Sequence, residues 1–391
     1  MSAAVDRTRV GHCLHRLCQA VFLLALAGCA EATVRQLSPT DPPARRAGVL
    51  QIRWRTQLHE HGLFEASPQE CATGVLAHDH LVIGSRAASV VGVDVAHGHV
   101  DWVTTTSGGI DSEARFDPAR DTVYLGADDG NFYALDARRG SVRWSYRSKG
   151  AIERPAEIDG SSVYVATAAD RVFSLDAATG KWRWGYERET PEGFTIHGYA
   201  GPRLSGRSLL SGFADGFLVS LAADSGEVLW ARSLAAVSEQ FVDVDSTPII
   251  DGGATYVSSY SGGVYALDAK DGSVRWRLGI EGAGSLALAD HQLYLAAPRL
   301  GVQALNVSGQ LLWRQGLTSA GELTTPMVVG PYLIFSGSRA GMFVVDRQTG
   351  ELLELFNPGS GVCAAPTVST ERQTLYVLSN GGALYALDLV L

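Results

Sequence analysis

One motif recurs along most of the chain and constrains its fold more than any other feature of the sequence. Its fullest copies place an Asp, a Gly four residues later and a Trp four residues after the Gly, as in Asp176, Gly180 and Trp184. The first position recurs at intervals of 38 to 46 residues, at Asp94, Asp136, Asp176, Ala222, Asp268, Asn306, Asp346 and Asp388. Repeats with a period of roughly 20 to 50 residues are typical of solenoids and propellers, in which each copy buries its apolar face against the next.

The copies predict an all-β ring. Each contains strand-like pairs such as Val123–Leu125 and Tyr133–Asp136, with room for four short strands in about 43 residues. The last copy ends at Leu391 before any Trp, and Ile52-Arg53-Trp54 supplies the missing strand from the other end of the chain. We therefore expect residues 51–391 to form an eight-bladed β-propeller with four-stranded blades. An N-terminal strand that pairs into the last blade would close it and remove the exposed sheet edges.

The most regular residues of the motif are expected to stabilise the fold rather than to take part in catalysis. An Asp at the end of a strand accepts hydrogen bonds from the backbone of the turn that follows, and Gly supplies the positive φ of that turn. The Trp buries a large apolar area between neighbouring blades, with its N–H donated to a carbonyl. The seventh copy has Glu354 in place of the Trp.

The first 28 residues have the pattern of an export signal. Three Arg precede the apolar run Leu17–Ala27, which at about eleven residues is too short to cross a bilayer, since spanning takes roughly 20. Leu26-Ala27-Gly28-Cys29 resembles the lipobox of bacterial lipoproteins, whose Cys is acylated and becomes the mature N-terminus. This resemblance implies a signal peptide at 1–28, a lipid on Cys29 and, from Ala30, sorting to the outer membrane. Residues 29–50 are then a tether between lipid and propeller.

The charge balance excludes one class of partner. The formal net charge is −9 and the sequence pI is near 5.6. Nucleic-acid binding rests on basic residues that neutralise phosphates, so a nucleic-acid partner is not expected.

The repeat resembles the tryptophan-docking motif of pyrroloquinoline-quinone-type propellers. Quinoprotein dehydrogenases share this motif with the BamB family of outer-membrane assembly lipoproteins. The lipobox and the length are similar to the BamB family, and so are two segments outside the motif. Asp243–Pro248 resembles the family's Asp-Val-Asp-Thr-Thr-Pro stretch, and Phe194–Pro202 resembles its Leu-Ser-Leu-Arg-Gly-Glu-Ser-Ala-Pro loop. The resemblance covers about residues 50–391.

In the BamB family these two segments form a surface that docks on the periplasmic domains of the barrel insertase BamA. The resemblance implies apolar anchors at Phe194 and Ile196, and carboxylates of Asp243 and Asp245 beside basic groups of the partner. His197 stands where the family has Arg, which replaces a fixed cation by a weaker, pH-dependent donor. The alternative is that Asp243 and Asp245 satisfy the backbone of a turn.

Enzymatic chemistry finds little support in the sequence. Quinoprotein dehydrogenases are typically longer, with insertions that roof the quinone and an adjacent Cys-Cys pair that this chain lacks. Gly-x-Ser-x-Gly and phosphate-binding motifs are also missing. We therefore expect no catalytic residue and no cofactor.

Histidines are the remaining candidate metal ligands. Three His-x-His pairs lie near one another in the sequence, and the turns that carry the second and third emerge on one face of a propeller. Solvated turn histidines are the alternative that we favour, so no metal is predicted. The pairs are His59 and His61, His78 and His80, and His97 and His99.

After removal of the signal peptide and acylation of Cys29, two cysteines remain as thiols. Cys71 and Cys363 each precede the second strand of their repeats by about ten to twelve residues, which assigns both to innermost strands. Their repeats are the first and the eighth, which are neighbours in a closed ring. A disulfide across the seam is one reading, and two buried free thiols are the other.

These features together predict a non-catalytic, lipid-anchored scaffold on the periplasmic side of the outer membrane. By resemblance its partners would be a BamA-like insertase, other barrel-assembly lipoproteins and unfolded outer-membrane proteins. A generic binding propeller for another envelope partner or a polysaccharide is the first alternative, and a quinone-dependent oxidoreductase is the second.

Overall fold

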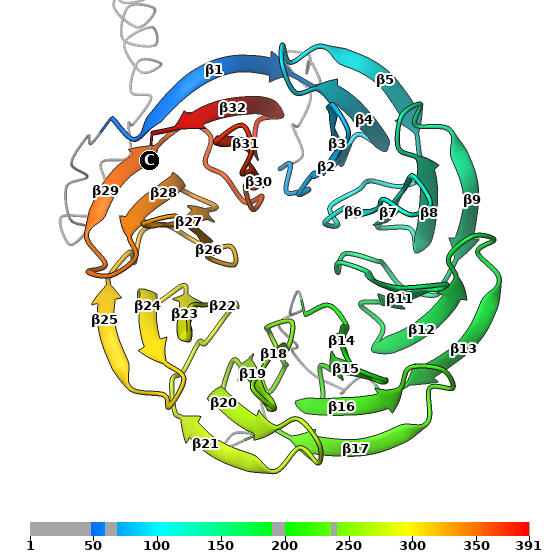
Figure 1. The fold of residues 1–391 in the computed structure, drawn as a ribbon, viewed down its shortest axis with the longest axis vertical. Helices are drawn as coiled ribbons and strands as arrows, with labels where there is room; N and C mark the ends of the chain where they lie inside the picture. The colour runs from blue at the N-terminus through cyan, green and yellow to red at the C-terminus, as the bar shows by residue number, and fades with distance from the viewer. Residues whose placement is uncertain (1–47, 59–68, 190–199, 236–240, 391) are drawn as a thin grey trace, which may run out of the picture. The chain divides into compact units, whose positions relative to one another are not determined.

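The computed structural model describes residues 48–58, 69–189, 200–235 and 241–390, and these form a ring of eight four-stranded antiparallel sheets (Figure 1). Each of blades 1 to 7 uses four consecutive strands, and blade 8 combines the last three strands with the first. The predicted eight-bladed propeller is therefore confirmed. The expected signal peptide, Cys29 and nearly all of the tether lie outside the described residues.

The first strand of each blade lies near the axis of the ring and the fourth lies on its circumference (Figure 1). Blade 1 consists of β2 (Val75–Ala77), β3 (His80–Ser85), β4 (Ser89–Asp94) and β5 (Val100–Thr105), and blade 2 of β6 (Arg115–Asp117), β7 (Thr122–Gly126), β8 (Asn131–Asp136) and β9 (Val142–Arg147). Blade 3 consists of β10 (Glu157–Asp159), β11 (Ser162–Ala166), β12 (Arg171–Asp176) and β13 (Trp182–Glu187), and blade 4 of β14 (Arg203–Ser205), β15 (Ser208–Gly212), β16 (Phe217–Ala222) and β17 (Val228–Ser233). Blade 5 consists of β18 (Ile249–Asp251), β19 (Ala254–Ser259), β20 (Gly263–Asp268) and β21 (Val274–Leu278), and blade 6 of β22 (Leu286–Ala289), β23 (Gln292–Ala297), β24 (Gly301–Asn306) and β25 (Leu311–Gln315). Blade 7 consists of β26 (Met327–Val329), β27 (Tyr332–Gly337), β28 (Gly341–Asp346) and β29 (Leu352–Phe356), and blade 8 of β30 (Thr367–Ser369), β31 (Thr374–Leu378), β32 (Ala383–Leu389) and β1 (Leu50–Gln57).

Burial follows position within the blade. The second and third strands are buried on both faces, because each blade packs between two others; β7 is buried throughout. Fourth strands such as β9 alternate between exposed and half-buried residues, because their outer face meets solvent. The core is therefore a series of layers between blades rather than a single central cluster.

Gly and Trp of the motif interlock between neighbouring blades. Gly140 has a φ of 70°, and a Cβ on it would lie 2.2 Å from the Trp102 ring of the preceding blade. The Trp N–H reaches a carbonyl of the next blade in several copies. These pairs, at 3.0–3.1 Å, are Trp54 with Val95, Trp144 with Ala177, Trp184 with Ala223, Trp276 with Val307, and Trp313 with Arg347.

The Asp of the motif has two functions in the fold. The Oδ1 atom of Asp136 accepts the N–H groups of Arg138 and Arg139 in the turn, as the sequence predicted. Its Oδ2 atom accepts from Arg143 at 2.7 Å. Arg143 is the extra residue of a bulge between the third and fourth strands, next to Trp144. The same ion pair recurs at 2.7–2.8 Å in Arg53 with Asp388, Arg183 with Asp176, and Arg275 with Asp268.

The ring closes through the N-terminal strand. β1 lies beside β32, the blue and red strands of Figure 1, and pairs with it from Leu50 opposite Leu389 to Gln57 opposite Ala383. The predicted closure is therefore confirmed. Glu354 adds a contact that the sequence did not reveal, because its Oε2 atom accepts the backbone N–H groups of Val49 at 2.7 Å and Leu50 at 3.1 Å.

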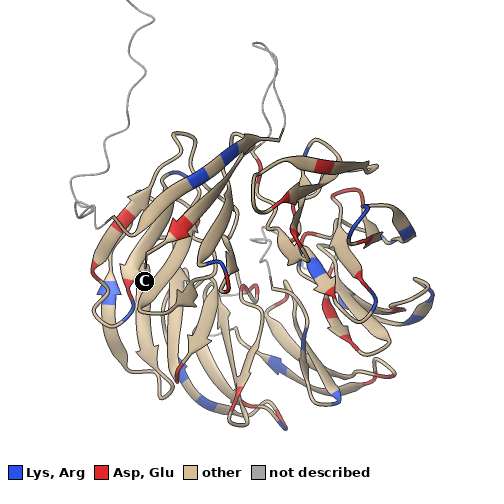
Figure 2. Ribbon diagram, turned by 45° about the horizontal axis from the view of Figure 1, so that its top comes forward, with Lys and Arg blue, Asp and Glu red and all other residues tan. Residues whose placement is uncertain are grey.

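Charged positions of both signs are interspersed around the blades (Figure 2). Within the described ranges, no helix is sufficiently long and apolar to traverse a membrane.

Candidate functional site

The residues predicted to dock on a partner come from two segments. Phe194, Ile196 and His197 belong to 190–199, which lie outside the described residues. Asp243 and Asp245 are described, and they lie in the lead-in to β18, the innermost strand of blade 5. We call Asp243–Thr247 the aspartate segment.

Main-chain pairing with blade 5 fixes the aspartate segment. Val244 forms an antiparallel bridge with Ser259 at the end of β19. Asp245 N donates to Ser258 O at 3.0 Å, and Tyr260 N donates to Asp243 O at 3.2 Å. The segment therefore pairs with the end of β19, the same strand with which β18 pairs.

Val244 also joins the segment to blade 4. Its N–H donates to Phe213 O at 3.3 Å, and a Cβ on Gly212 would lie 2.4 Å from Val244 Cγ1. Ile110 packs in the same way on Gly84 in blade 1, and Ile152 on Gly126 in blade 2; a Cβ on either Gly would clash. A branched apolar residue wedged over the glycine of the preceding blade is thus a repeated joint of the propeller. A larger residue at Gly212 would force Val244 out of its position.

The far end of the aspartate segment contacts the flank of the other predicted docking segment. Gly201, two residues after 190–199, donates its N–H to Thr247 Oγ1 at 2.8 Å. Gly201 also lies against Pro155, since a Cβ on it would be 2.7 Å from Pro155 O. Lead-in segments of blades 3, 4 and 5 therefore meet at one place in the ring.

The two carboxylates are shielded from solvent to different degrees, since Asp243 is buried and Asp245 is half-buried. Asp243 is 1% exposed. Burial and the neighbouring charge of Asp243 raise the pKa of Asp245 to about 8, and Arg154 opposes this shift. Asp243 is hidden from solvent, and the charges of Asp243 and Asp245 favour the ionised form of Arg154. Contact of the two carboxylates with a partner's basic groups stays a prediction. A backbone hydrogen bond from Tyr260 also acts to lower the pKa of the Asp245 carboxylate, which agrees with the alternative that the carboxylates satisfy backbone groups. Other bonds of the segment to blades 4 and 5 run through the main chain, Ser246 and Thr247.

Arg154 is the residue of this region that sequence reasoning missed. It precedes Pro155 in blade 3, at the place that Gly201 and Thr247 occupy before prolines in blades 4 and 5. These three segments share a proline just before the innermost strand, and this proline is a sequence signal by which they could have been aligned. The charge at Arg154 would then have stood out against its small or neutral counterparts.

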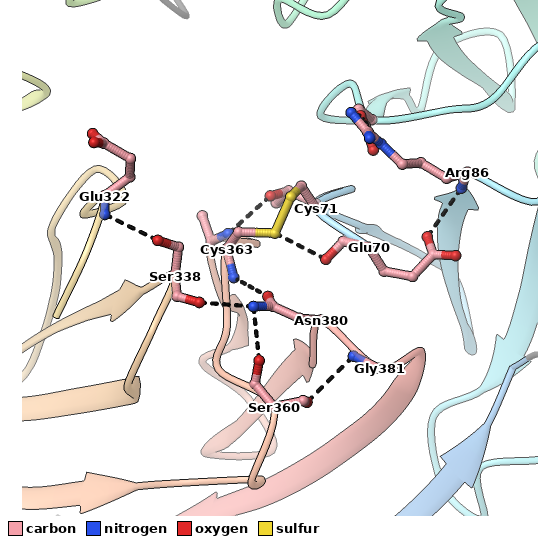
Figure 3. The surroundings of a disulfide bond; sticks show 12 residues. Glu70, Cys71, Arg86, Glu322, Ser338, Ser360, Cys363, Asn380 and Gly381 are labelled. Carbon is pink, nitrogen blue, oxygen red and sulfur yellow. Dashed lines mark hydrogen bonds and ion pairs between the residues drawn. A yellow bond between two sulfur atoms is a disulfide. The ribbon is translucent and has the colours of Figure 1, made fainter. Parts of the chain in front are cut away.

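The seam between blades 1 and 8 carries a disulfide between Cys71 and Cys363, whose Cα atoms are 5.0 Å apart (Figure 3). Both cysteines precede the innermost strands β2 and β30 rather than lying on them, which corrects the placement expected from the sequence. Asn380 supports the site, because its Oδ1 accepts Cys363 N at 2.8 Å and its Nδ2 donates to Ser338 O and Ser360 O. The hydrogen bonds of Asn380 thus connect the disulfide to blade 7 as well.

Most of the described histidines contact carboxylates, and the His99 ring stacks on His97 with their centroids 5.9 Å apart. His78 contacts Asp121, His80 lies 2.8 Å from Asp101, and His97 lies 3.0 Å from Asp94. Among residues that the structure describes, no group of three or more His, Cys, Asp or Glu side chains could hold a metal ion. His59 and His61 lie outside the described residues.

Comparison with known proteins gives a consistent result. The family model described as "Outer membrane protein assembly factor BamB" matches residues 48–149, 86–309 and 299–390. The chain is 34% identical over 186 residues to the Legionella pneumophila (strain Paris) protein of that description, over 46% of this chain and 48% of that protein. It is 24% identical over 377 residues to the Burkholderia pseudomallei (strain K96243) protein of the same description, over 94% and 95% of the two chains. The crystal structure of BamB from Moraxella catarrhalis has the same fold, with a TM-score of 0.74 at 24% identity over 87% of this chain and 100% of that chain.

Proposed function

The chain belongs to the outer membrane protein assembly factor BamB family, and we propose that it is a lipid-anchored scaffold that docks on a BamA-like barrel insertase. Members of this family are assembly factors rather than catalysts, and the chain is a non-catalytic member. The proposed place of action is the periplasmic face of the outer membrane, with the lipid on Cys29. Other barrel-assembly lipoproteins and unfolded outer-membrane proteins complete the proposed set of partners.

One observation in particular supports the proposed docking surface. The flank of segment 190–199 is hydrogen-bonded to the aspartate segment through Gly201 and Thr247. Two stretches that resemble the family's docking loops are thus joined, although about 50 residues separate them in sequence. In this proposal Phe194 and Ile196 contact the partner, while Asp243 and Asp245 shape the surface from beneath.

The test is a binding titration between the mature protein and the purified periplasmic domains of the insertase. Changing Phe194 and Ile196 together to Ala should weaken binding by about tenfold or more, as loss of apolar anchors does at other interfaces. Ile52 and Val103 are each 60% exposed on outer strands, so their double Ala variant is a matched control. Equal affinity of both double variants and wild type would reject the docking surface.

The histidine in place of the family's arginine gives a second test. His197→Arg should tighten binding most above pH 7, where a histidine with an ordinary pKa is neutral. Binding that is independent of this substitution at every pH from 5.5 to 8.5 would exclude His197 from the contact. Co-purification from detergent-solubilised membranes of a different envelope partner, without the insertase, would favour the generic binding propeller.

The lipid anchor is tested separately from docking. Mass spectrometry of the mature N-terminus should find an acylated Cys29, and Cys29→Ala should abolish the lipid. An unmodified N-terminus at any other residue would reject the anchor and leave the docking proposal unaffected.

A further inference from the structure

The described chain contains a buried arginine that joins three blades. Arg154 is 6% exposed and precedes β10 in blade 3. Its Nη1 atom lies 3.5 Å from the carbonyl oxygen of Gly212 at the end of β15 in blade 4. Gly212 is the residue on which Val244 of the aspartate segment packs. The guanidinium therefore reaches from blade 3 to the joint that seats the segment.

Charges around Arg154 explain how a guanidinium is tolerated there. Burial lowers the pKa of Arg154, and the carboxylates of Asp170, Glu153, Asp243 and Asp245 act in the opposite direction. A buried cation without such partners is costly, and so is a pair of buried carboxylates without a cation. Asp243 and Asp245 flank Val244, and the positive charge of Arg154 acts on both side chains at the joint.

Asp170 anchors the same cluster from the turn between β11 and β12. It is 1% exposed, and its Oδ1 atom accepts Ala214 N of blade 4 at 2.9 Å. Its Oδ2 atom has no hydrogen-bond partner among the described residues. This carboxylate therefore adds negative charge near Arg154 while fixing the turn of blade 4 that also receives Val244 N–H.

We propose that Arg154 is a positioning residue of the docking surface, whose guanidinium holds the Asp243–Thr247 segment on blade 4 in the shape that the partner binds. The proposal rests on the proposed docking function for its last step only. Without the guanidinium, the buried carboxylate of Asp243 loses a positive charge that acts on it and Gly212 O loses a donor, so the segment moves away from Gly212.

The decisive measurement is hydrogen exchange in the mature protein, because it reports on the segment without any partner. In Arg154→Met, the amides of Val244 and Asp245 should exchange about tenfold faster or more, since their acceptors Phe213 O and Ser258 O are lost when the segment moves. The amide of Ile110, which bonds to Ser85 O in the equivalent joint of blade 1, should not change. Unchanged exchange at Val244 and Asp245 would overturn the proposal.

Two further variants separate a positioning role from a general loss of stability. Arg154→Met combined with Asp243→Asn removes the buried carboxylate of Asp243 together with the cation, and should restore most of the protection. Arg86→Met is the matched control, because Arg86 pairs with Asp111 next to the Ile110 joint. It should leave the Asp245 amide protected. Equal loss of protection in the control and in Arg154→Met, or no rescue by Asp243→Asn, would show a general effect and reject the proposal.

The binding titration with the insertase domains completes the test. Arg154→Met should weaken binding by about tenfold, with recovery in the double variant. Faster exchange with unchanged affinity would overturn the link between Arg154 and docking. If wild type itself does not bind, the proposed function fails while the exchange result still decides whether Arg154 positions the segment.

Discussion

Replacing Cys71 and Cys363 by Ser tests how the ring is held closed. The bonded residues are 292 positions apart, so the disulfide turns most of the propeller into one loop in the unfolded chain. Closing a loop of this length removes unfolded-state entropy worth about 5 to 6 kcal/mol at 25 °C in the chain-entropy description. Residual structure in real unfolded chains reduces this figure, so we expect a loss of about 3 to 5 kcal/mol in the free energy of unfolding.

The native ring should survive that loss, because other bonds cross the same seam. Thr367 Oγ1 donates to Gly74 O at 2.7 Å, and Ala365 N donates to Thr73 Oγ1 at 3.1 Å. β1 also remains paired with β32. The double Ser variant should therefore show the circular dichroism of wild type in buffer and differ only in stability.

Guanidinium chloride unfolding, followed by tryptophan fluorescence and circular dichroism, measures the effect. Oxidised wild type should unfold at higher denaturant than the double variant, and its m-value should be smaller, because a cross-linked unfolded chain exposes less surface. Cys71→Ser alone is the control, since it removes the same link and should match the double variant. If mass spectrometry finds the bond in wild type and the variants are still within about 1 kcal/mol of it, the loop-entropy reasoning is wrong.

Three other predictions follow from single carboxylates. Glu354→Ala should lower the free energy of unfolding by about 2 kcal/mol, because two backbone N–H groups at the start of β1 lose their acceptor; denaturant unfolding at pH 7 measures it, and an unchanged midpoint would contradict it. The pKa of Asp245 is raised to about 8, so the folded state retains a proton that the unfolded chain releases above 3.8, and stability linked to this group falls as pH rises from 3.8 to about 8. Asp245→Asn should therefore raise the unfolding midpoint more at pH 8 than at pH 5, whereas equal shifts at both pH values would refute the assignment. Hydrogen bonds from Arg183 and Thr179 lower the pKa of Asp176 to about 2, so its stabilising contribution is present above 3.8 and is lost as pH falls towards 2; an NMR titration should find this pKa moved upwards in Arg183→Gln, and an unmoved value would exclude the ion pair.

The repeat alone was enough to predict the architecture, because its residues act through local and nearest-neighbour physics. Gly140 and Trp102 interlock with the same spacing that recurs along the chain, so counting copies also counts blades. Trp54 could be assigned to the last blade because a closed ring needs one more fourth strand than the C-terminal copies supply. Such inferences need only spacing and the requirement that sheet edges be paired.

The chemistry of the candidate site was less accessible from sequence. The notable positions were Asp243 and Asp245, but the cation whose charge acts on them is Arg154, about 90 residues earlier. Nothing in the local pattern around Arg154 distinguishes a buried guanidinium from a solvated one. Only the packing of blades 3, 4 and 5 brings these charges together, so the environment of the carboxylates could not be predicted.

Glu354 shows why a departure from the repeat can be as informative as the repeat. In five other blades a Trp N–H donates to a carbonyl of the next blade, as Trp313 does to Arg347 O. At the closure the arriving segment presents the N–H groups of Val49 and Leu50 instead, so the polarity of the contact is reversed. A donor in the motif position would leave those groups without an acceptor, whereas a carboxylate satisfies both.

Cys363 is a second departure from the repeat, on the inner side of the ring. It comes directly after Val362, whose N–H bonds to Gly337 O in the joint that Ile110, Ile152 and Val244 form elsewhere. The residue after the wedge is acidic in those three copies, and in the eighth copy it is the cysteine that reaches blade 1. The repeat thus loses its usual residue both on β29, the outer strand of blade 7, and in the segment before β30, the innermost strand of blade 8. In each case the replacement forms a bond that a chain continuing into another blade would not need, so both substitutions are explained by closing a linear array into a ring.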